Sequence, residues 1–262
     1  MWAQPPALSL EQQEQFLATA KVIKSRQVNE GITGIRRLTL TDGTLTHDAA
    51  FQTIDEAKVN FDAGNASELN FRDCWKYSVA AYRLGKMLGL DTIPATVERK
   101  YSGSTGALTW WVDDVMMNQT AMLQKHLRPP DARAWNMQMQ TVRVFDQLIY
   151  NVDRNAGNLL ITRDWTLWMI DHTRAFRLYH DLKNPQMLAI CDREMFQKMK
   201  DLNQDQLEKQ LMPYLNRREI EGVLARRDKI VNFFVAGGDA VLFSQPPRAV
   251  IEKGAMPKEA AR

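Results

Sequence analysis

Three polar residues in the middle of the chain have the types and the order of a site that handles a metal-bound phosphate. Asp153 opens the polar segment DRNAGN, Asn158 closes it five positions later, and Asp171 follows Asn158 by thirteen residues. Carboxylate and carboxamide oxygens are ligands that Mg²⁺ or Mn²⁺ takes beside nucleotide phosphates, and a further carboxylate orients an acceptor hydroxyl. The three residues therefore predict phosphoryl transfer.

The neighbouring sequence predicts the elements that position these residues. Residues 132–150 have the apolar spacing of a helix, and 159–162 and 166–170 have the pattern of a hairpin. The hairpin would bring Asn158 and Asp171 to the same end of a sheet. Each residue alone has a simpler interpretation, since Asp153 suits an Asx turn after a helix and Asp171 suits the end of a strand. The ordered set favours the site.

The N-terminal part alternates between the periods of strands and helices. Residues 19–29, 35–41 and 44–54 predict three antiparallel strands, with a hairpin turn at Asp42-Gly43. Residues 55–70 are polar and are expected to be irregular. We expect a helix over 71–90, strands over 93–98 and 107–117, and mainly helices thereafter.

This pattern predicts an α+β chain with a small antiparallel sheet and a helical part. We place the boundary at residue 118, so that 1–118 form one lobe and 119–262 form the other.

The segments DRNAGNLLI and IDHTRAF resemble the catalytic loop and metal-binding strand of phosphatidylinositol-kinase-like enzymes. They are more similar still to the secretory-pathway casein kinases and their bacterial relatives, an atypical kinase family. The helix entering the loop (FDQLIYNVDR) and the segment YSVAAYRLGKMLGLDTIP are also similar to that family. The resemblance extends over residues 30–180 and implies a two-lobed protein-kinase-like fold.

The resemblance also implies roles for individual residues. Asp153 would be the catalytic base, and Asn158 and Asp171 would bind Mg²⁺ or Mn²⁺ with ATP. Further residues would contact the nucleotide, namely Gly31, Thr33 and Gly34 in the covering loop and Trp111 to Asp114, including Asp113, in the connector beside the adenine.

One pair of family residues is missing. Kinases of this fold use a strand Lys on the nucleotide phosphates and a helix Glu that holds it, but the corresponding positions are Gln52 and, nearby, Ser78. Another base would have to reach the phosphates, and the candidates are Lys58, Lys76, Lys21 and Lys24.

Three functions remain open at this point. The first is an ATP-dependent kinase that acts on a hydroxyl of a protein, lipid, sugar or metabolite. The second is a pseudokinase that binds nucleotide as a regulatory or scaffold module, and the third is nucleotidyl transfer (AMPylation) on the same fold. The loss of the Lys–Glu pair supports the second.

Several other polar residues have an ordinary structural interpretation. The Gly31-x-x-Gly34 spacing also fits a plain β-turn, His47-Asp48 fits a strand start, and His172 is expected to pack locally. Of Trp110 and Trp111, one at most can line a pocket, because they lie on opposite faces of a strand.

The arginines are expected to have structural roles. Arg174 is expected to bridge to Asp153 or Asp171 and hold the loop. Four more are expected on the solvated face of the last helix, namely Arg217, Arg218, Arg226 and Arg227.

Composition excludes several classes of protein. The net charge of +3 is spread along 262 residues, which argues against a nucleic-acid partner. Cys74 and Cys191 have no metal-ligand spacing and are expected to be reduced thiols.

No stretch approaches the ~18 apolar residues of a membrane span, and the first residues lack the pattern of a signal peptide. We therefore expect a cytoplasmic protein.

Overall fold

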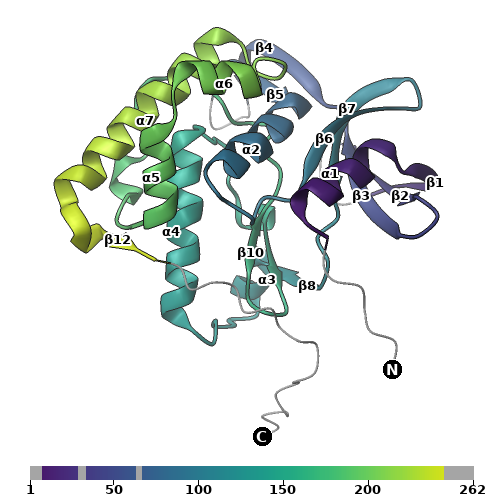
Figure 1. The fold of residues 1–262 in the computed structure, drawn as a ribbon, viewed down its shortest axis with the longest axis horizontal. Coiled ribbons are helices and arrows are strands. Elements are labelled where there is room, and N and C mark those ends of the chain that lie inside the picture. Colours follow the sequence, from purple (N-terminus) through teal and green to yellow (C-terminus); the bar gives the residue numbers. More distant parts are fainter. Residues whose placement is uncertain (1–7, 29–33, 63–66, 245–262) are drawn as a thin grey trace, which may run out of the picture.

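A computed structural model of the protein describes residues 8–28, 34–62 and 67–244. Its N-terminal part is built on a five-stranded antiparallel sheet in the order β1-β2-β3-β7-β6 (Figure 1). Buried Leu38 and Leu40 alternate with more exposed residues along β2, as expected for a strand with one face on the core. The strands are β1 (Lys21–Gln27), β2 (Arg36–Thr41), β3 (Thr46–Gln52), β6 (Thr96–Tyr101) and β7 (Ser104–Trp110).

Two helices pack against this sheet. Helix α1 (Leu10–Thr19), which the sequence analysis did not predict, contacts β6 and β7 and begins with a capping box at Ser9. Helix α2 (Trp75–Met87) contacts β6 and β7 on one side and helix α6 (Gln204–Leu211) on the other. It therefore lies between the sheet and the helical part (Figure 1), and most of its residues are buried.

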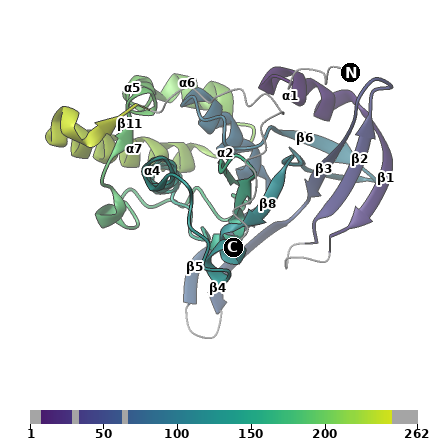
Figure 2. The same cartoon turned by 90° about the horizontal axis from the view of Figure 1, so that it is seen from below.

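The prediction that residues 55–70 are irregular is wrong for the described residues 55–62 and 67–70. They begin a hairpin of strands β4 (Asp55–Asp62) and β5 (Ser67–Cys74), which projects from the molecule in Figure 2. Its polar composition matches a two-stranded ribbon outside the main sheet, where alternating apolar residues are not needed. Because β5 runs to Cys74, helix α2 begins at Trp75 and not at the predicted residue 71.

The C-terminal part is mainly helical, as predicted. Helix α4 leads into a three-stranded sheet of order β10-β9-β8, in which β8 pairs with β9. The predicted strand 107–117 is therefore two strands in separate sheets. The elements are β8 (Val115–Asn118), α3 (Gln119–Gln124), α4 (Ala132–Leu148), η1 (Ala156–Asn158), β9 (Leu159–Thr162), β10 (Leu167–Met169), η2 (Pro185–Met187), β11 (Cys191–Asp192), α5 (Arg193–Asp201), α6 (Gln204–Leu211), α7 (Arg217–Gly237), η3 (Gly238–Val241) and β12 (Leu242–Phe243).

The predicted solvated face of α7 needs one correction. Arg217 and Arg218 are exposed as expected, but Arg226 is completely buried and Arg227 is partly buried. The Arg226 guanidinium donates to the carbonyls of Leu148, Arg177 and Tyr179, which lie on other segments. Helical periodicity alone cannot reveal such partners.

The α+β fold class is thus confirmed, while the division at residue 118 stays a prediction. Both cysteines are free and buried, and burial raises the pKa of the Cys74 thiol to about 11. None of the helices in the described part of the chain is both long and apolar enough to cross a membrane.

Candidate active site

Helix α4 ends in a tight turn that positions Asp153. Tyr150 has a left-handed backbone (φ 49°), which turns the chain out of the helix. The Asn151 side chain donates to Asp146 Oδ1 at 3.0 Å and accepts from the Asp153 backbone N–H at 3.0 Å. The start of the loop is therefore fixed to the buried last turn of α4.

The loop then curls so that Asn158 returns to Asp153. Asn155 accepts a hydrogen bond from the Gly157 N–H at 2.9 Å, and this Asx turn opens the short helix η1. The Asn158 side-chain amide donates to the Asp153 carbonyl at 3.3 Å. The loop thus brings together the two residues that the sequence predicted as base and metal ligand.

The hairpin β9–β10 brings Asp171 to the same loop. The Ile170 N–H donates to the Asn158 carbonyl at 3.1 Å, which places the next residue, Asp171, beside Asn158. Asp171 has a left-handed backbone (φ 54°), and its Oδ1 accepts from the Thr173 hydroxyl at 3.0 Å. A strained backbone at this position fits a residue whose orientation has a function.

A partly buried ion pair that the sequence analysis missed connects all of these parts. Arg154 donates to Asp146 on α4 at 2.9 Å, to the Asn158 carbonyl at 3.0 Å and to the Ile170 carbonyl at 2.8 Å. One guanidinium therefore holds the helix, the loop and the hairpin in place. The presence of Arg directly after Asp153 is the only sequence signal of this role.

Arg174 has the structural role that the sequence predicted. Its guanidinium lies 3.9 Å from Asp153 and stacks over the Phe71 ring at 4.9 Å from the ring centre. Its carbonyl also accepts from the Val152 N–H. His172, two residues before Arg174, is buried and contacts Phe145 edge-on, which confirms local packing.

Asp73, at the end of β5, is a second residue that the sequence analysis missed. It is 8% exposed, and its Oδ1 has no hydrogen-bond partner among the described residues. Thr173 is within hydrogen-bond reach of Asp73, and Asp171 is close enough to act on its charge. Burial raises the pKa of the Asp73 carboxyl, and the negative charge of Asp171 raises it further.

The oxygen atoms at this site suit a hard cation. Asn158 and Asp171 offer a carboxamide and a carboxylate, and the buried Oδ1 of Asp73 is a third oxygen close by. Nowhere in the described chain do three His, Cys, Asp or Glu side chains form a metal cluster. Mg²⁺ commonly binds through one or two carboxylates plus substrate phosphates, so this set fits a metal that arrives with a nucleotide.

We predict that Asp73→Asn stabilises the protein at neutral pH. A carboxyl whose folded pKa is raised contributes stability that is fully present below its ordinary pKa of 3.8 and is lost as pH rises through the folded pKa. The neutral amide avoids that loss, so the melting temperature at pH 7 should rise by about 2–4 °C, the shift caused by ~1 kcal/mol. The gain should shrink as pH approaches 4. Exposed Glu221→Gln serves as the control, and a gain that is constant from pH 4 to 8 would contradict the prediction.

The predicted nucleotide residues in the small lobe are only partly described. Gly31 and Thr33 lie outside the described residues, while Gly34 has a left-handed backbone (φ 63°) just before β2. Gln52 is buried at the end of β3, opposite Ala107, and Ser78 is buried on α2. The two residues to which the resemblance assigns the positions of the Lys–Glu pair are thus buried and uncharged.

Four lysines could take the place of the missing strand Lys, and of these Lys58 lies near a side chain, Phe71, that Arg174 also contacts. Its ammonium lies 5.6 Å from the Phe71 ring, on which Arg174 also stacks, and 3.1 Å from Glu56. Lys21 and Lys24 are exposed on the edge strand β1. Lys76, like Lys58, lines a pocket formed by the β4–β5 hairpin, the start of α2, residues 176–179 and the loop from α6 to α7.

The connector after β7 is held by two aromatic contacts. Trp110 is buried and stacks on His47 with ring centres 3.7 Å apart, and Arg37 lies 4.0 Å from the centre of the Trp111 ring. The His47 ring nitrogen Nε2 also lies 3.1 Å from Asp113. His47 is thus part of β3 and contacts the connector, in agreement with the strand interpretation of His47-Asp48.

Comparison with solved structures supports the same fold. The chain is similar to hydra Fam20 with sugar, at 14% identity over 90% of this chain and 92% of that one, with a TM-score of 0.64. It is also similar to the Golgi casein kinase with Mn/ADP bound, at 13% identity over 90% of this chain and 78% of that one, with a TM-score of 0.62. For the Helicobacter pylori proinflammatory kinase CtkA the identity is 10%, over 84% of this chain and 95% of that one, and the TM-score is 0.51.

No protein-family model matches the sequence, and a search of curated proteins finds no match. The structural similarities show a two-lobed protein-kinase-like fold, and they confirm the predicted resemblance at that level.

Proposed function

We propose that the protein is an ATP-dependent phosphotransferase of the atypical kinase type, acting on a hydroxyl acceptor. The observation that carries this proposal is that two hydrogen bonds hold Asn158 to Asp153 and to Ile170, the residue before Asp171: the Asn158 amide donates to the Asp153 carbonyl, and the Ile170 N–H donates to the Asn158 carbonyl. The solved structure of the Golgi casein kinase with Mn/ADP bound supports a nucleotide and a divalent metal for this fold.

Each residue has a role in this proposal. Asp153 accepts a hydrogen bond from the acceptor hydroxyl and takes its proton as the oxygen attacks the γ-phosphorus of ATP. Asn158 and Asp171 hold Mg²⁺ or Mn²⁺, which neutralises charge on the transferred phosphoryl group. Arg154 and Arg174 keep the loop in shape, and ADP is the leaving group.

The small lobe covers the nucleotide in this proposal. We assign Gly31, Thr33 and Gly34, together with Gln52 and Lys58, to contacts with the phosphates, and Trp111 and Asp113 to contacts with the adenine. Lys58 is the base that we assign to the phosphates, because the Phe71 ring links it to Arg174.

Asp171→Asn tests the metal site. The amide keeps the shape of the side chain but loses its charge, so Mn²⁺-dependent binding of ATP should weaken by about 100-fold. The measurement is a thermal-shift titration with ATP in the presence and absence of Mn²⁺. Exposed Asp181→Asn, which lies ten residues further along the chain, is the control. ATP binding that is equal in Asp171→Asn and the parent protein would refute the proposed metal role.

A pseudokinase is the second candidate, and the uncharged Gln52 and Ser78 favour it. A protein of this kind would bind Mn²⁺–ATP in the thermal-shift titration and release no ADP. Nucleotidyl transfer is the third candidate. Incubation with ATP followed by intact-mass measurement distinguishes it from phosphoryl transfer, because an AMP group and a phosphate group add different masses.

A further inference from the structure

Asp73 carries a buried oxygen atom to which the described residues donate no hydrogen bond. Its side chain is 8% exposed, and the atom concerned is Oδ1. A buried acceptor without a donor destabilises the fold, so such an atom in a native protein calls for an explanation. The roles proposed above use Asp153, Asn158 and Asp171 and leave Asp73 without one.

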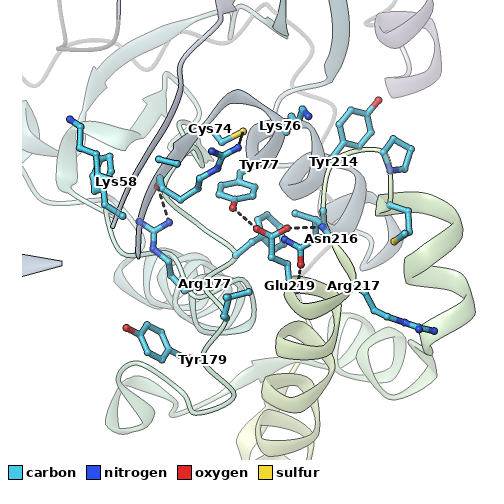
Figure 3. A pocket seen from close by; sticks show the side chains of 18 residues that line it. Lys58, Cys74, Lys76, Tyr77, Arg177, Tyr179, Tyr214, Asn216, Arg217 and Glu219 are labelled. Atoms are coloured by element: carbon cyan, nitrogen blue, oxygen red, sulfur yellow. Dashed lines mark hydrogen bonds between the residues drawn. The ribbon is translucent and has the colours of Figure 1, made fainter. Parts of the chain in front are cut away.

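The β4–β5 hairpin turns the Asp73 side chain toward the metal site. Phe71 and Asp73 are two residues apart on β5, so their side chains point to the same face of the hairpin. The Arg174 guanidinium lies 4.9 Å from the centre of the Phe71 ring, which shows that this face looks onto the segment that follows Asp171. Figure 3 shows Cys74, which belongs to the opposite face, at the edge of the pocket that it lines.

One hydroxyl contacts both Asp73 and Asp171. The Thr173 hydroxyl donates to Asp171 Oδ1 at 3.0 Å and is also within hydrogen-bond reach of Asp73. The backbone holds this arrangement, because the Cys74 N–H donates to the Thr173 carbonyl at 2.9 Å. A hydroxyl has a single proton to donate, so it satisfies one of the two carboxylates at a time. The two carboxylates therefore lie close together and share one donor.

The charges around these two carboxylates leave an excess of negative charge. Arg174 is close to Asp73, but the same guanidinium also lies 3.9 Å from Asp153. Glu56 is paired with Asp73 across the hairpin and adds a further negative charge, which Lys58 offsets from 3.1 Å. A divalent cation between the two carboxylates would supply the missing positive charge and a partner for the buried oxygen.

We propose that Asp73 is a third protein ligand of the metal, and that its Oδ1 binds the same Mg²⁺ or Mn²⁺ ion as Asn158 and Asp171. Three oxygen ligands from the protein leave the other positions of an octahedral ion to nucleotide phosphates and water. This inference rests on the function proposed above, because the metal is the one that arrives with the nucleotide.

A metal held in this way joins the two parts of the molecule. Asp73 belongs to β5, directly before helix α2, whereas Asn158 ends the loop after α4 and Asp171 follows β10. Binding of the metal with its nucleotide would therefore fix the start of α2 against the helical part. In other kinases the strand Lys and the helix Glu connect the nucleotide to the corresponding helix. Gln52 and Ser78 carry no charge and cannot form that connection here.

Mn²⁺ binding in the presence of a non-hydrolysable ATP analogue tests this role without any turnover. Free Mn²⁺ is measured by electron paramagnetic resonance, and Asp73→Asn is expected to weaken Mn²⁺ binding by about tenfold or more. Glu56→Gln is the matched control, because it removes an exposed negative charge that is paired with Asp73 on the same hairpin. Its Mn²⁺ affinity should stay within roughly threefold of the parent protein, since charges in solvent are screened.

The melting temperature gives a second readout, which a purely structural role of Asp73 would not change in the same way. Without metal, Asp73→Asn should melt above the parent protein at pH 7, as predicted above. The rise in melting temperature caused by saturating Mn²⁺ and the analogue should be roughly 3–5 °C smaller in the variant, the difference that a tenfold loss of affinity produces in a chain of this size. A variant that is more stable without metal and gains less from it has lost a ligand and not its fold.

The Asp171→Asn variant, measured in the same experiment, separates this inference from the proposed function. If Asp171→Asn loses Mn²⁺ while Asp73→Asn binds it as tightly as the parent protein, Asp73 is not a ligand and the proposed function stands. An equal loss in Asp73→Asn and Glu56→Gln would also overturn the inference, because it would reflect charge alone. A parent protein that binds no Mn²⁺ with the analogue would refute the proposed function and this inference together.

Discussion

Asp153→Asn is expected to lower Mn²⁺-dependent ADP release about a thousandfold while leaving ATP affinity within roughly threefold of the parent protein. General-base catalysis contributes 10²–10⁴-fold to typical reactions, and an amide cannot take the acceptor proton. The amide does preserve the shape of the side chain and the hydrogen bond from the Asp153 backbone N–H to Asn151. The measurement is ADP release together with a thermal-shift titration with ATP.

This variant also tests the simpler interpretation of Asp153. If Asp153 only formed a turn after helix α4, Asn would replace it without loss, because Asn suits the same turn. Unchanged ADP release in Asp153→Asn would therefore contradict the catalytic role. Asp181→Asn again provides the control for loss of an exposed carboxylate, and a parallel loss of ATP binding in Asp153→Asn would point to a misfolded loop.

The loop from Asp153 to Asn158 could be predicted from the sequence because its contacts are local. Asp153 and Asn158 are five residues apart, and Asn158 meets the strand before Asp171 through a short hairpin. Helix period, turn residues and hairpin pattern are all visible within this one segment. The resemblance to an atypical kinase family depended on the same residues.

Asp73 could not be predicted because its contact is distant in sequence. It approaches Thr173, 100 residues further along the chain, and it does so from a hairpin whose polar residues gave no strand pattern. The pocket beside Asp73 could not be predicted for the same reason. Its walls come from β5, α2 and the α6–α7 loop, which only the folded chain brings together.

Arg226 shows the limit of helical periodicity in another way. A charged residue on a helix predicts a solvated face, since an unpaired buried charge is costly. That cost is avoided here because three backbone carbonyls accept from the guanidinium. Burial nevertheless lowers the pKa of Arg226 to about 10, which leaves it charged at neutral pH.

Arg226→Met is accordingly expected to lower the free energy of unfolding by roughly 3–5 kcal/mol, because three buried carbonyls lose their donor and each buried acceptor left unsatisfied costs about 1–3 kcal/mol. Methionine fills much of the volume but leaves the carbonyls of Leu148, Arg177 and Tyr179 without their donor. The melting temperature should fall by about 10 °C, given ~2–4 °C per kcal/mol in a chain of this size. Arg218→Met, on the exposed face of the same helix, should change it little.

The same variant should also affect the candidate active site, because Arg226 holds the segment that follows Asp171. The carbonyls of Arg177 and Tyr179 lie on this segment, and Arg177 in turn donates to the Arg72 carbonyl on β5. Below its melting temperature, Arg226→Met should therefore bind Mn²⁺–ATP more weakly than Arg218→Met does. Arg226→Lys should fall between the parent protein and Arg226→Met, since one ammonium keeps the charge but cannot reproduce the planar fork of donors. A melting temperature of Arg226→Met equal to that of the parent would show that the three carbonyls find other donors and that Arg226 does not hold this segment.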